Sequence, residues 1–216
     1  MQIISHRGYW KDFATESNKK IAFERSFNMG IGTETDLRDV KGTIVISHDM
    51  PRGTEMTFEE LLQIMSGRNL PLALNIKADG LGTEIERLLM KYEHTNYFTF
   101  DMSVPDLVYQ TEKTNLNVYT GCSDMNPYSP MNKKVKGIWL DAFYEVWYSE
   151  KQIIDFLNTG KEVCIVSEDL HGRVNDKQWC MLNRYEFLDN DRIMLCTNEP
   201  DKAAMYFGSR DLQAYV

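Results

Sequence analysis

The sequence has no long hydrophobic run. No stretch approaches the roughly 18 consecutive apolar residues that a membrane-spanning helix needs. After Met1, the first apolar stretch holds only Ile3 and Ile4, which is too short for the apolar segment of a secretory signal peptide. We therefore expect no transmembrane segment and a cytoplasmic location.

Cysteine is scarce and its spacing is irregular. The four cysteines are Cys122, Cys164, Cys180 and Cys196, and they do not form the close pairs of a zinc finger. Cys164 and Cys196 lie within apolar runs, so we expect buried free thiols rather than disulfides. Linkers, internal repeats and low-complexity segments are also absent from the sequence, which predicts a single domain over residues 1–216.

A positive charge balance is missing as well. Lysine and arginine total 24 against 32 aspartates and glutamates, which gives a net charge of −8. Because an acidic surface repels polyanions, we expect no nucleic-acid partner. A small phosphorylated ligand is still compatible with this charge, since a local cationic pocket can override the overall field. The composition leaves the oligomeric state open.

The sequence does contain a repeated alternation of short apolar runs with amphipathic stretches. Strands are predicted at residues 2–5, 31–36, 72–77, 97–100, 116–120, 137–141, 162–166 and 192–196. Helices are predicted at 18–29, 57–65, 81–92, 104–114, 150–158, 176–187 and 200–207, and the Pro- and Asn-rich segment 123–134 is predicted to be a loop or a single turn. This alternation is typical of a parallel α/β sheet. Eight units in 216 residues predict a compact (β/α)8 TIM barrel, with a doubly wound open sheet as the alternative.

The first three predicted strands end in polar residues. The pairs are His6 and Arg7, Glu34 and Asp36, and Asn75 and Lys77. Members of the second and third pairs are two residues apart, so both side chains of each pair point to the same face of the sheet. Because the chemistry of a barrel lies at the C-terminal ends of its strands, we expect the three pairs to meet in one cavity.

A second histidine, His48, follows a predicted hairpin. A loop formed by residues 41–42 would pair His48 with Thr35 and turn the imidazole away from the carboxylates. A loop formed by residues 40–42 would pair His48 with Glu34 and place the imidazole beside them. We predict the longer loop, because it gives the glycine of the loop the left-handed position.

These residue types suit the chemistry of a phosphate ester. The oxygens of Glu34, Asp36 and Asn75 are hard ligands for one divalent cation, Mg²⁺ or Ca²⁺, rather than for zinc. The fixed positive charges of Arg7 and Lys77 suit a phosphate group.

Two histidines complete the set. His6 and His48 can divide the work of a general base and a general acid across a phosphorus centre. Asp141 ends the sixth predicted strand and is expected in the substrate pocket, beside the leaving alcohol, whereas His171 is interpreted as a solvated loop residue. Together, the residues predict metal-assisted hydrolysis of a small phosphodiester.

At these positions the chain resembles the glycerophosphodiester phosphodiesterase family. HRG at residues 6–8 is similar to the opening motif of the family, and ESNKKIAFERSFNMGIGTETDLRDVKGTIVISHD at residues 16–49 is similar to its next block. LNIK at residues 74–77 is similar to a later strand of the family, and CTNEPDKAAMYF at residues 196–207 is similar to its last strand and helix. The matches run in order along nearly the whole chain, but the segment between the fourth and seventh strands matches in pattern alone.

The resemblance implies a barrel and assigns roles to residues already singled out: a divalent cation on Glu34 and Asp36, an acid–base pair in His6 and His48, and phosphate contacts from Arg7 and Lys77. Asn75 stands where the family has an acidic third ligand, which predicts weaker cation binding. Asn198 stands where the last strand usually has aspartate. The segment after Asp49 is short, and because it helps to shape the glycerol pocket in the family, the alcohol of the substrate is left open.

Asn75 and Asn198, which stand where the family has acidic residues, support one alternative function. A catalytically impaired barrel would bind a phosphorylated ligand without turnover. The presence of both histidines, both carboxylates and both cationic side chains favours the enzyme, because a decayed site would more often have lost one of them. A different barrel chemistry, such as sugar-phosphate isomerisation, does not require paired histidines beside two carboxylates.

Overall fold

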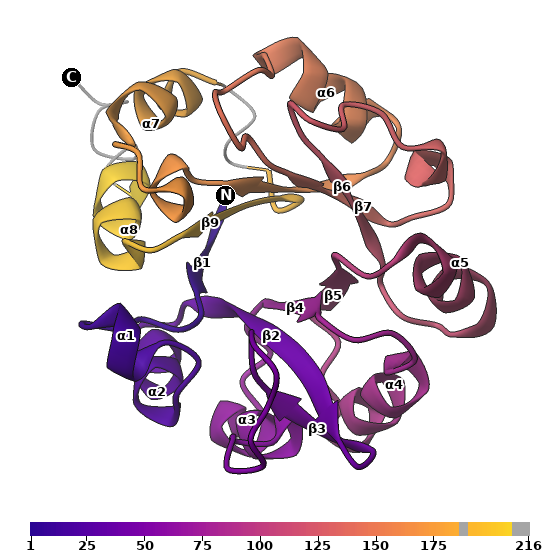
Figure 1. The fold of residues 1–216 in the computed structure, drawn as a ribbon. Helices are drawn as coiled ribbons and strands as arrows, with labels where there is room; N and C mark the ends of the chain where they lie inside the picture. The colour runs from indigo at the N-terminus through magenta and orange to yellow at the C-terminus, as the bar shows by residue number, and fades with distance from the viewer. Residues whose placement is uncertain (186–189, 209–216) are drawn as a thin grey trace.

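Eight parallel strands form a ring at the centre of the molecule, and helices surround the ring (Figure 1). The computed structural model describes residues 1–185 and 190–208. The strands are β1 (Gln2–His6), β2 (Gly32–Val40), β3 (Thr43–Ile46), β4 (Leu72–Ile76), β5 (Tyr97–Phe100), β6 (Tyr119–Cys122), β7 (Gly137–Leu140), β8 (Glu162–Val166) and β9 (Ile193–Thr197). Their hydrogen-bonded order is β5-β4-β2-β1-β9-β8-β7-β6, with β3 antiparallel to β2 outside the ring. Between β5 and β6 the ring closes through an isolated parallel bridge from Thr99 to Val118.

Helices connect most of the strands. They are α1 (Phe13–Glu16), α2 (Lys20–Asn28), α3 (Phe58–Met65), α4 (Gly82–Lys91), α5 (Val104–Lys113), α6 (Glu150–Asn158), α7 (Asp176–Asn183) and α8 (Pro200–Gly208), with the 3-10 helices η1 (Pro130–Lys133) and η2 (Glu168–His171). The connection from β6 to β7 holds η1, in agreement with the predicted single turn. In the described part of the chain, no helix has both the length and the apolar character needed to cross a membrane. The predicted (β/α)8 barrel is confirmed.

Two predicted elements have different bounds in the structure. The strand predicted at 116–120 begins later, at Tyr119, because the backbone before it meets β5 only through the isolated bridge of Thr99 with Val118. The helix predicted at 176–187 ends at Asn183, and residues 186–187 of that prediction lie outside the described residues.

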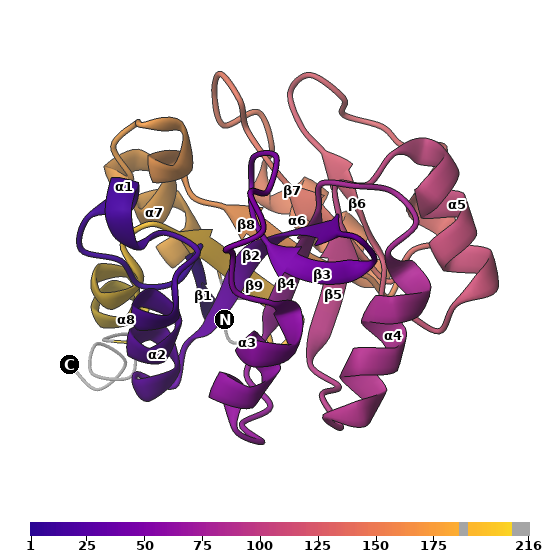
Figure 2. The same cartoon turned by 60° about the horizontal axis from the view of Figure 1, so that its bottom comes forward.

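The predicted loop of the β2–β3 hairpin is wrong. The register pairs Val40 with Thr43, so the loop contains two residues, Lys41 and Gly42. Their φ angles are 52° and 84°, as a type I′ turn requires at both positions. The prediction assumed that glycine alone would be left-handed, but Lys41 adopts the same conformation. Strand β2 consequently continues four residues past Asp36, and Figure 2 shows the hairpin in front of the ring, above α3.

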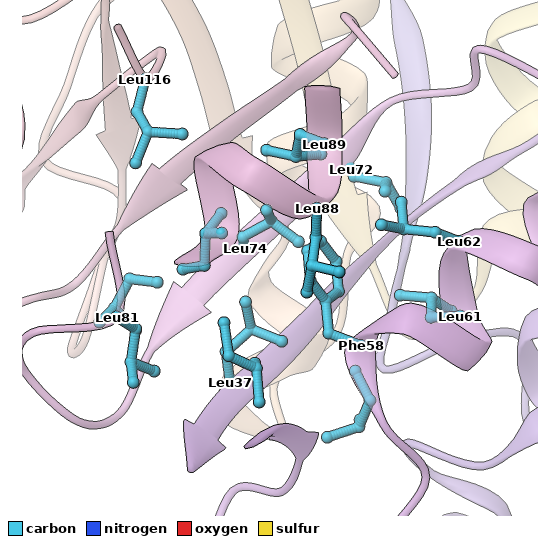
Figure 3. Packing of buried hydrophobic residues seen from close by; sticks show 14 of the residues in the cluster. Leu37, Phe58, Leu61, Leu62, Leu72, Leu74, Leu81, Leu88, Leu89 and Leu116 are labelled. Carbon is cyan, nitrogen blue, oxygen red and sulfur yellow. The ribbon is translucent and has the colours of Figure 1, made fainter. Parts of the chain in front are cut away.

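The outer layer of the core lies between the strands and the helices. One buried cluster joins α3 and α4 to β2 and β4, and its members include Leu37, Leu61, Leu74, Leu88 and Leu89 (Figure 3). Helix α3 starts with a capping box, in which the N-cap threonine and the glutamate three residues later each accept a backbone N–H of the other. The cap satisfies donors at the helix start and leaves the apolar face of α3 free to pack.

The inside of the ring holds a separate apolar layer. Its buried members are Ile4, Ala73, Phe98, Phe100, Tyr119, Trp139, Cys164, Val166, Met194 and Cys196. The ring of Phe98 stacks on that of Tyr119 with centroids 3.8 Å apart, and Phe100 stacks on Trp139 at 4.0 Å. Cys164 and Cys196 are buried free thiols, as predicted.

This apolar layer determines where polar side chains can gather. Side chains alternate between the two faces of a strand, so the next inward position after Ile4 is His6, and the next after Ala73 is Asn75. The inside of the ring is therefore apolar where the strands begin and polar where they end.

Replacing Gly137 with alanine will destabilise the fold. A Cβ atom at this position would overlap with the phenol ring of Tyr119, which is fully buried. We expect Gly137→Ala to lower the free energy of unfolding by about 1–3 kcal/mol, measured by urea denaturation. Gly121→Ala on the neighbouring strand is the control, because its Cβ would meet nothing within 4 Å. Equal stability of the two variants would contradict the packing described for the inner layer.

Candidate active site

A cavity of about 540 Å³ opens at the C-terminal ends of the strands. This volume is within the range of small-molecule sites. The predicted site residues that line it are His6, Arg7, Glu34, His48, Asn75, Lys77 and Asp141. The remaining predicted residue, Asp36, is fully buried behind the lining and contacts two members of it. The structure thus brings the predicted set together.

A tight turn after β1 directs the first of these residues. Arg7 and Gly8 both have left-handed backbones, with φ of 58° and 83°. A Cβ atom on Gly8 would lie 2.7 Å from the Cβ of Ala22, so the position requires glycine. The backbone N–H of Arg7 donates to the carbonyl of Glu34 at 3.0 Å. This turn explains why the apolar first strand ends in the sequence HRG.

Asp36 is the centre of a buried charge cluster. Its Oδ2 lies 2.9 Å from Nε of Arg7, and its Oδ1 lies 3.7 Å from Nζ of Lys77. The side-chain amide of Asn18 donates to Oδ2 at 2.8 Å. The two cations predicted to bind phosphate therefore contact a carboxylate here, and their contact with phosphate stays a prediction.

Glu34 has no such cation beside it. Its side chain is about as buried as that of Asp36, and its Oε2 lies 3.9 Å from Nε2 of His6. Burial, followed by the negative charge of Asp36, raises the pKa of Glu34 to about 8. The two carboxylates, two residues apart on one strand, thus have very different surroundings.

Three buried oxygens in this cluster have no hydrogen-bond partner among the described residues. They are Oε2 of Glu34, Oδ1 of Asp36 and Oδ1 of Asn75. Asp36 and Asn75 are opposite each other in the register of β2 and β4. Buried acceptors are normally satisfied, and three carboxylate or amide oxygens are suitable ligands for a hard divalent cation. No three His, Cys, Asp or Glu side chains of the described chain could hold a metal, so the fit depends on the amide of Asn75.

His6 is held by Asn198. Nδ1 of His6 lies 2.7 Å from Oδ1 of Asn198, whose amide group donates to the backbone carbonyl of Asp169 at 2.9 Å. The amide orientation makes Oδ1 an acceptor, so Nδ1 carries the hydrogen and Nε2 of the neutral ring is free to accept a proton. Burial, followed by the charge of Arg7, lowers the pKa of His6 to about 4, and the ring is neutral near pH 7.

His48 reaches the cavity despite the corrected hairpin register. Strand β3 ends at Ile46, so the alternation of the strand does not extend to His48. The backbone N–H of Ser47 donates to the carbonyl of Asp36 at 3.0 Å, which holds the loop against β2. The imidazole lines the cavity, is about half exposed, and has Nδ1 2.9 Å from Oδ1 of Asp49.

Asp141 lies on the far wall of the cavity and does not stand alone. Its Oδ1 is 2.7 Å from Nε2 of His171, which also lines the cavity. The interpretation of His171 as a solvated loop residue is therefore wrong: η2 folds the loop after β8 inward and brings the imidazole onto Asp141.

The sequence analysis missed three residues that shape the site: Asn18, Asn198 and His171. Asn18 lies inside the block that resembles the phosphodiesterase family, and Asn198 was noted as a departure from that family, so both had a signal in the sequence. For His171 the signal was its position shortly after a predicted strand, where a barrel places its chemistry.

Comparison with known proteins gives structural neighbours and no sequence relatives. No protein-family model and no curated protein sequence matches the chain. A glycerophosphodiester phosphodiesterase from Agrobacterium tumefaciens str. C58 is similar in structure, with a TM-score of 0.71, 14% identity, and coverage of 96% of this chain and 99% of that one. A phosphodiesterase from Oleispira antarctica, solved in complex with the product sn-glycerol-3-phosphate, gives a TM-score of 0.68, 16% identity and 97% coverage of both chains. A glycerophosphoryl diester phosphodiesterase from Parabacteroides distasonis gives a TM-score of 0.62, 16% identity, and coverage of 96% of this chain and 86% of that one.

The chain has the fold of these phosphodiesterases. The resemblance drawn from the motifs is therefore confirmed at the level of the fold, over nearly the full length of each protein. Because folds of this class carry many chemistries, function has to be argued from the site itself.

Replacing Asn198 with aspartate will raise the pKa of His6. A carboxylate in place of the amide would face Nδ1, now 2.7 Å from Oδ1, and would favour the charged imidazole. We expect an upward shift of about one to three pKa units, measured by NMR titration of the imidazole signals. Asn198→Leu is the control and removes the hydrogen bond, so it should not raise the pKa. An unchanged His6 titration in Asn198→Asp would contradict the contact.

Proposed function

We propose that the protein is a phosphodiester hydrolase that cleaves a small phosphodiester with the help of a divalent cation. The observation that carries the proposal is the meeting of two histidines and two cationic side chains in one cavity, with three unpaired buried oxygens in its lining or directly behind it. The shared fold with phosphodiesterases supports the same reaction class.

The phosphate is proposed to bind between Arg7 and Lys77. Both side chains are mostly buried beside the cavity, so a phosphate there would meet fixed and poorly screened positive charge. Asp36 holds both cations from behind and orients them toward the cavity without filling it.

His6 is proposed as the general base. Its Nδ1 is taken up by Asn198, so Nε2 can remove a proton from the nucleophile, which is either water or a neighbouring hydroxyl of the substrate. His48 is then assigned the protonation of the leaving alcohol, because its imidazole also lines the cavity and its Nδ1 lies 2.9 Å from the carboxylate of Asp49. If the neighbouring hydroxyl attacks, a cyclic phosphate forms first.

Glu34, Asp36 and Asn75 are proposed to hold one divalent cation, Mg²⁺ or Ca²⁺. When bound, the cation would neutralise charge on the non-bridging oxygens of the phosphate. Its second effect concerns the protein itself: a cation at this position would favour the ionised form of Glu34.

Hydrolysis of bis(p-nitrophenyl) phosphate tests the proposed reaction. We expect turnover with Mg²⁺, Ca²⁺ or Mn²⁺ and none with EDTA, and a loss of about 10²–10⁴-fold in rate for His6→Ala and for His48→Ala. His94→Gln is the matched histidine control, because His94 is buried away from the cavity, where its Nε2 bonds the carbonyl of Asn96.

The same assay distinguishes the proposed hydrolase from the alternative, a barrel that binds without turnover. If the wild type binds phosphate esters by calorimetry but turns over no diester with any of these cations, the catalytically impaired binding barrel is the correct interpretation. Equal rates in wild type and in His6→Ala would contradict the assignment of His6 as the general base.

Cation binding is expected to release a proton. In the absence of a cation the pKa of Glu34 is about 8, so Glu34 is mostly protonated at pH 7, whereas a ligand must be ionised. Affinity for Mg²⁺ should therefore rise up to roughly tenfold per pH unit below pH 8 and then level off. Calorimetry in two buffers of different ionisation enthalpy measures the proton count, and Glu34→Gln should abolish the release. Binding without proton release at pH 7 would contradict the role of Glu34.

A further inference from the structure

The carboxylate of Asp101 lies beside one of the two cations of the cavity and has no role in the proposed mechanism. Its Oδ2 is 3.4 Å from Nζ of Lys77, and Asp101 itself lines the cavity. The other carboxylate near Lys77 is that of Asp36, whose Oδ1 lies 3.7 Å from Nζ. Asp36 is fully buried, whereas the side chain of Asp101 is 52% exposed. Lys77 thus has one carboxylate behind it and a second one on its open side.

The turn that carries Asp101 is anchored by its neighbours. The backbone of Asp101 is left-handed, with φ of 70°, a conformation that aspartate and asparagine tolerate better than most residues. Two residues later, the backbone N–H and the hydroxyl of Ser103 both donate to the carboxylate of Asp79, which follows β4. The hydroxyl oxygen of Ser103 also accepts the N–H of Asp106 and so caps the start of α5. Asp101 is therefore held between the end of β5 and a fixed helix start.

Asp101 changes the charge that a phosphate would meet in the cavity. Among the described residues that line the cavity, the fixed cations are Arg7 and Lys77. Asp36 offsets one of their two positive charges from behind, and Asp101 offsets the other. A phosphate oxygen in hydrogen-bond contact with Nζ of Lys77 would lie within about 6 Å of the Asp101 carboxylate, the sum of the two contacts. Each negative charge on the phosphate is therefore repelled by Asp101.

Phosphate esters differ in the number of these charges. A diester carries one negative charge, whereas a monoester carries about two above its second pKa of about 6. The second charge of the monoester is spread over its terminal oxygens, which are the atoms available to contact Lys77. Repulsion by Asp101 thus acts on one charge in a diester and on two in a monoester.

We propose that Asp101 is a specificity-determining residue, whose carboxylate beside Lys77 makes the cavity favour phosphodiesters over phosphate monoesters. The inference rests on the proposed function, which places the phosphate at Arg7 and Lys77. Hydrolysis of a diester adds water across one P–O bond and yields an alcohol and a monoester, which loses a further proton near pH 7. The same carboxylate therefore weakens binding of the product and promotes its release.

Calorimetry with three small anions tests the proposal without requiring turnover. The titrations are made with Mg²⁺ at about pH 8, above the second pKa of a monoester. Diethyl phosphate then carries one negative charge and ethyl phosphate two. Ethyl sulfate has the tetrahedral shape and the three terminal oxygens of ethyl phosphate but a single negative charge, so it separates charge from shape. Asp101→Asn removes the carboxylate, keeps the size of the side chain and suits the left-handed backbone.

The measured quantity is the ratio of the affinities for two anions, compared between the wild type and Asp101→Asn. We expect the substitution to raise the affinity for ethyl phosphate about three- to tenfold more than that for diethyl phosphate, the effect of one partly screened repulsion at this distance. The ratio of ethyl sulfate to diethyl phosphate should not change. Glu112→Gln is the matched control and should change neither ratio, because Glu112 is 48% exposed and pairs with Lys134 at 2.8 Å outside the cavity.

The outcomes separate this proposal from the proposed function. An unchanged ratio of ethyl phosphate to diethyl phosphate in Asp101→Asn, or a rise that ethyl sulfate shares, overturns the role of Asp101 even if diesters are hydrolysed. A rise confined to ethyl phosphate supports that role even if no diester is hydrolysed, in which case the hydrolase function fails alone. If none of the three anions binds to the wild type or to the variant, the phosphate site and the role of Asp101 fail together.

Discussion

The buried carboxylate of Asp36 is the constraint on which the rest of the site depends. A fully buried carboxylate is costly unless cations and donors meet it. Three residues outside β2 supply these groups: Arg7, Asn18 and Lys77. Arg7 can reach the carboxylate because the chain turns sharply at Gly8, and the same turn follows directly on His6. One electrostatic requirement thus fixes the position of a cation, of an amide and of the first histidine.

The two carboxylates of β2, Asp36 and Glu34, differ in their contacts with the positive charges of the site. Asp36 receives both cations, whereas Glu34 faces the cavity beside a histidine that is neutral near pH 7. With a pKa of about 8, Glu34 is mostly protonated near pH 7 in the absence of a cation, so the two buried carboxyl groups are not both charged. Asn75 adds an uncharged oxygen opposite Asp36 in the register of β2 and β4, so the cluster carries little excess negative charge.

The sequence was sufficient to predict the barrel and to predict that the polar residues at the ends of the first three strands meet in one cavity. Both predictions use local patterns, namely periodicity and the residues at strand ends. It was insufficient wherever a partner on another strand decides the outcome. Lys41 adopts a left-handed conformation that its residue type does not favour, and this changed the hairpin register. Leu116 belongs to an apolar run, but the run straddles the start of β6. The partner of His171 is 30 residues away on a different strand, so no spacing rule could have joined them.

The isolated bridge between β5 and β6 gives the barrel a seam. Elsewhere in the ring, neighbouring strands pair over several residues, whereas Thr99 and Val118 join this edge. Local openings of a native protein depend on both backbone bonds and buried contacts, so with few backbone bonds this edge depends on side-chain packing such as the stack of Phe98 on Tyr119. The cavity lies across it, with lining residues such as Met102 after β5 and Thr120 on β6. A ligand that contacts both sides binds the closed ring in preference to the open one, so occupancy of the cavity and slow hydrogen exchange along this edge are thermodynamically linked.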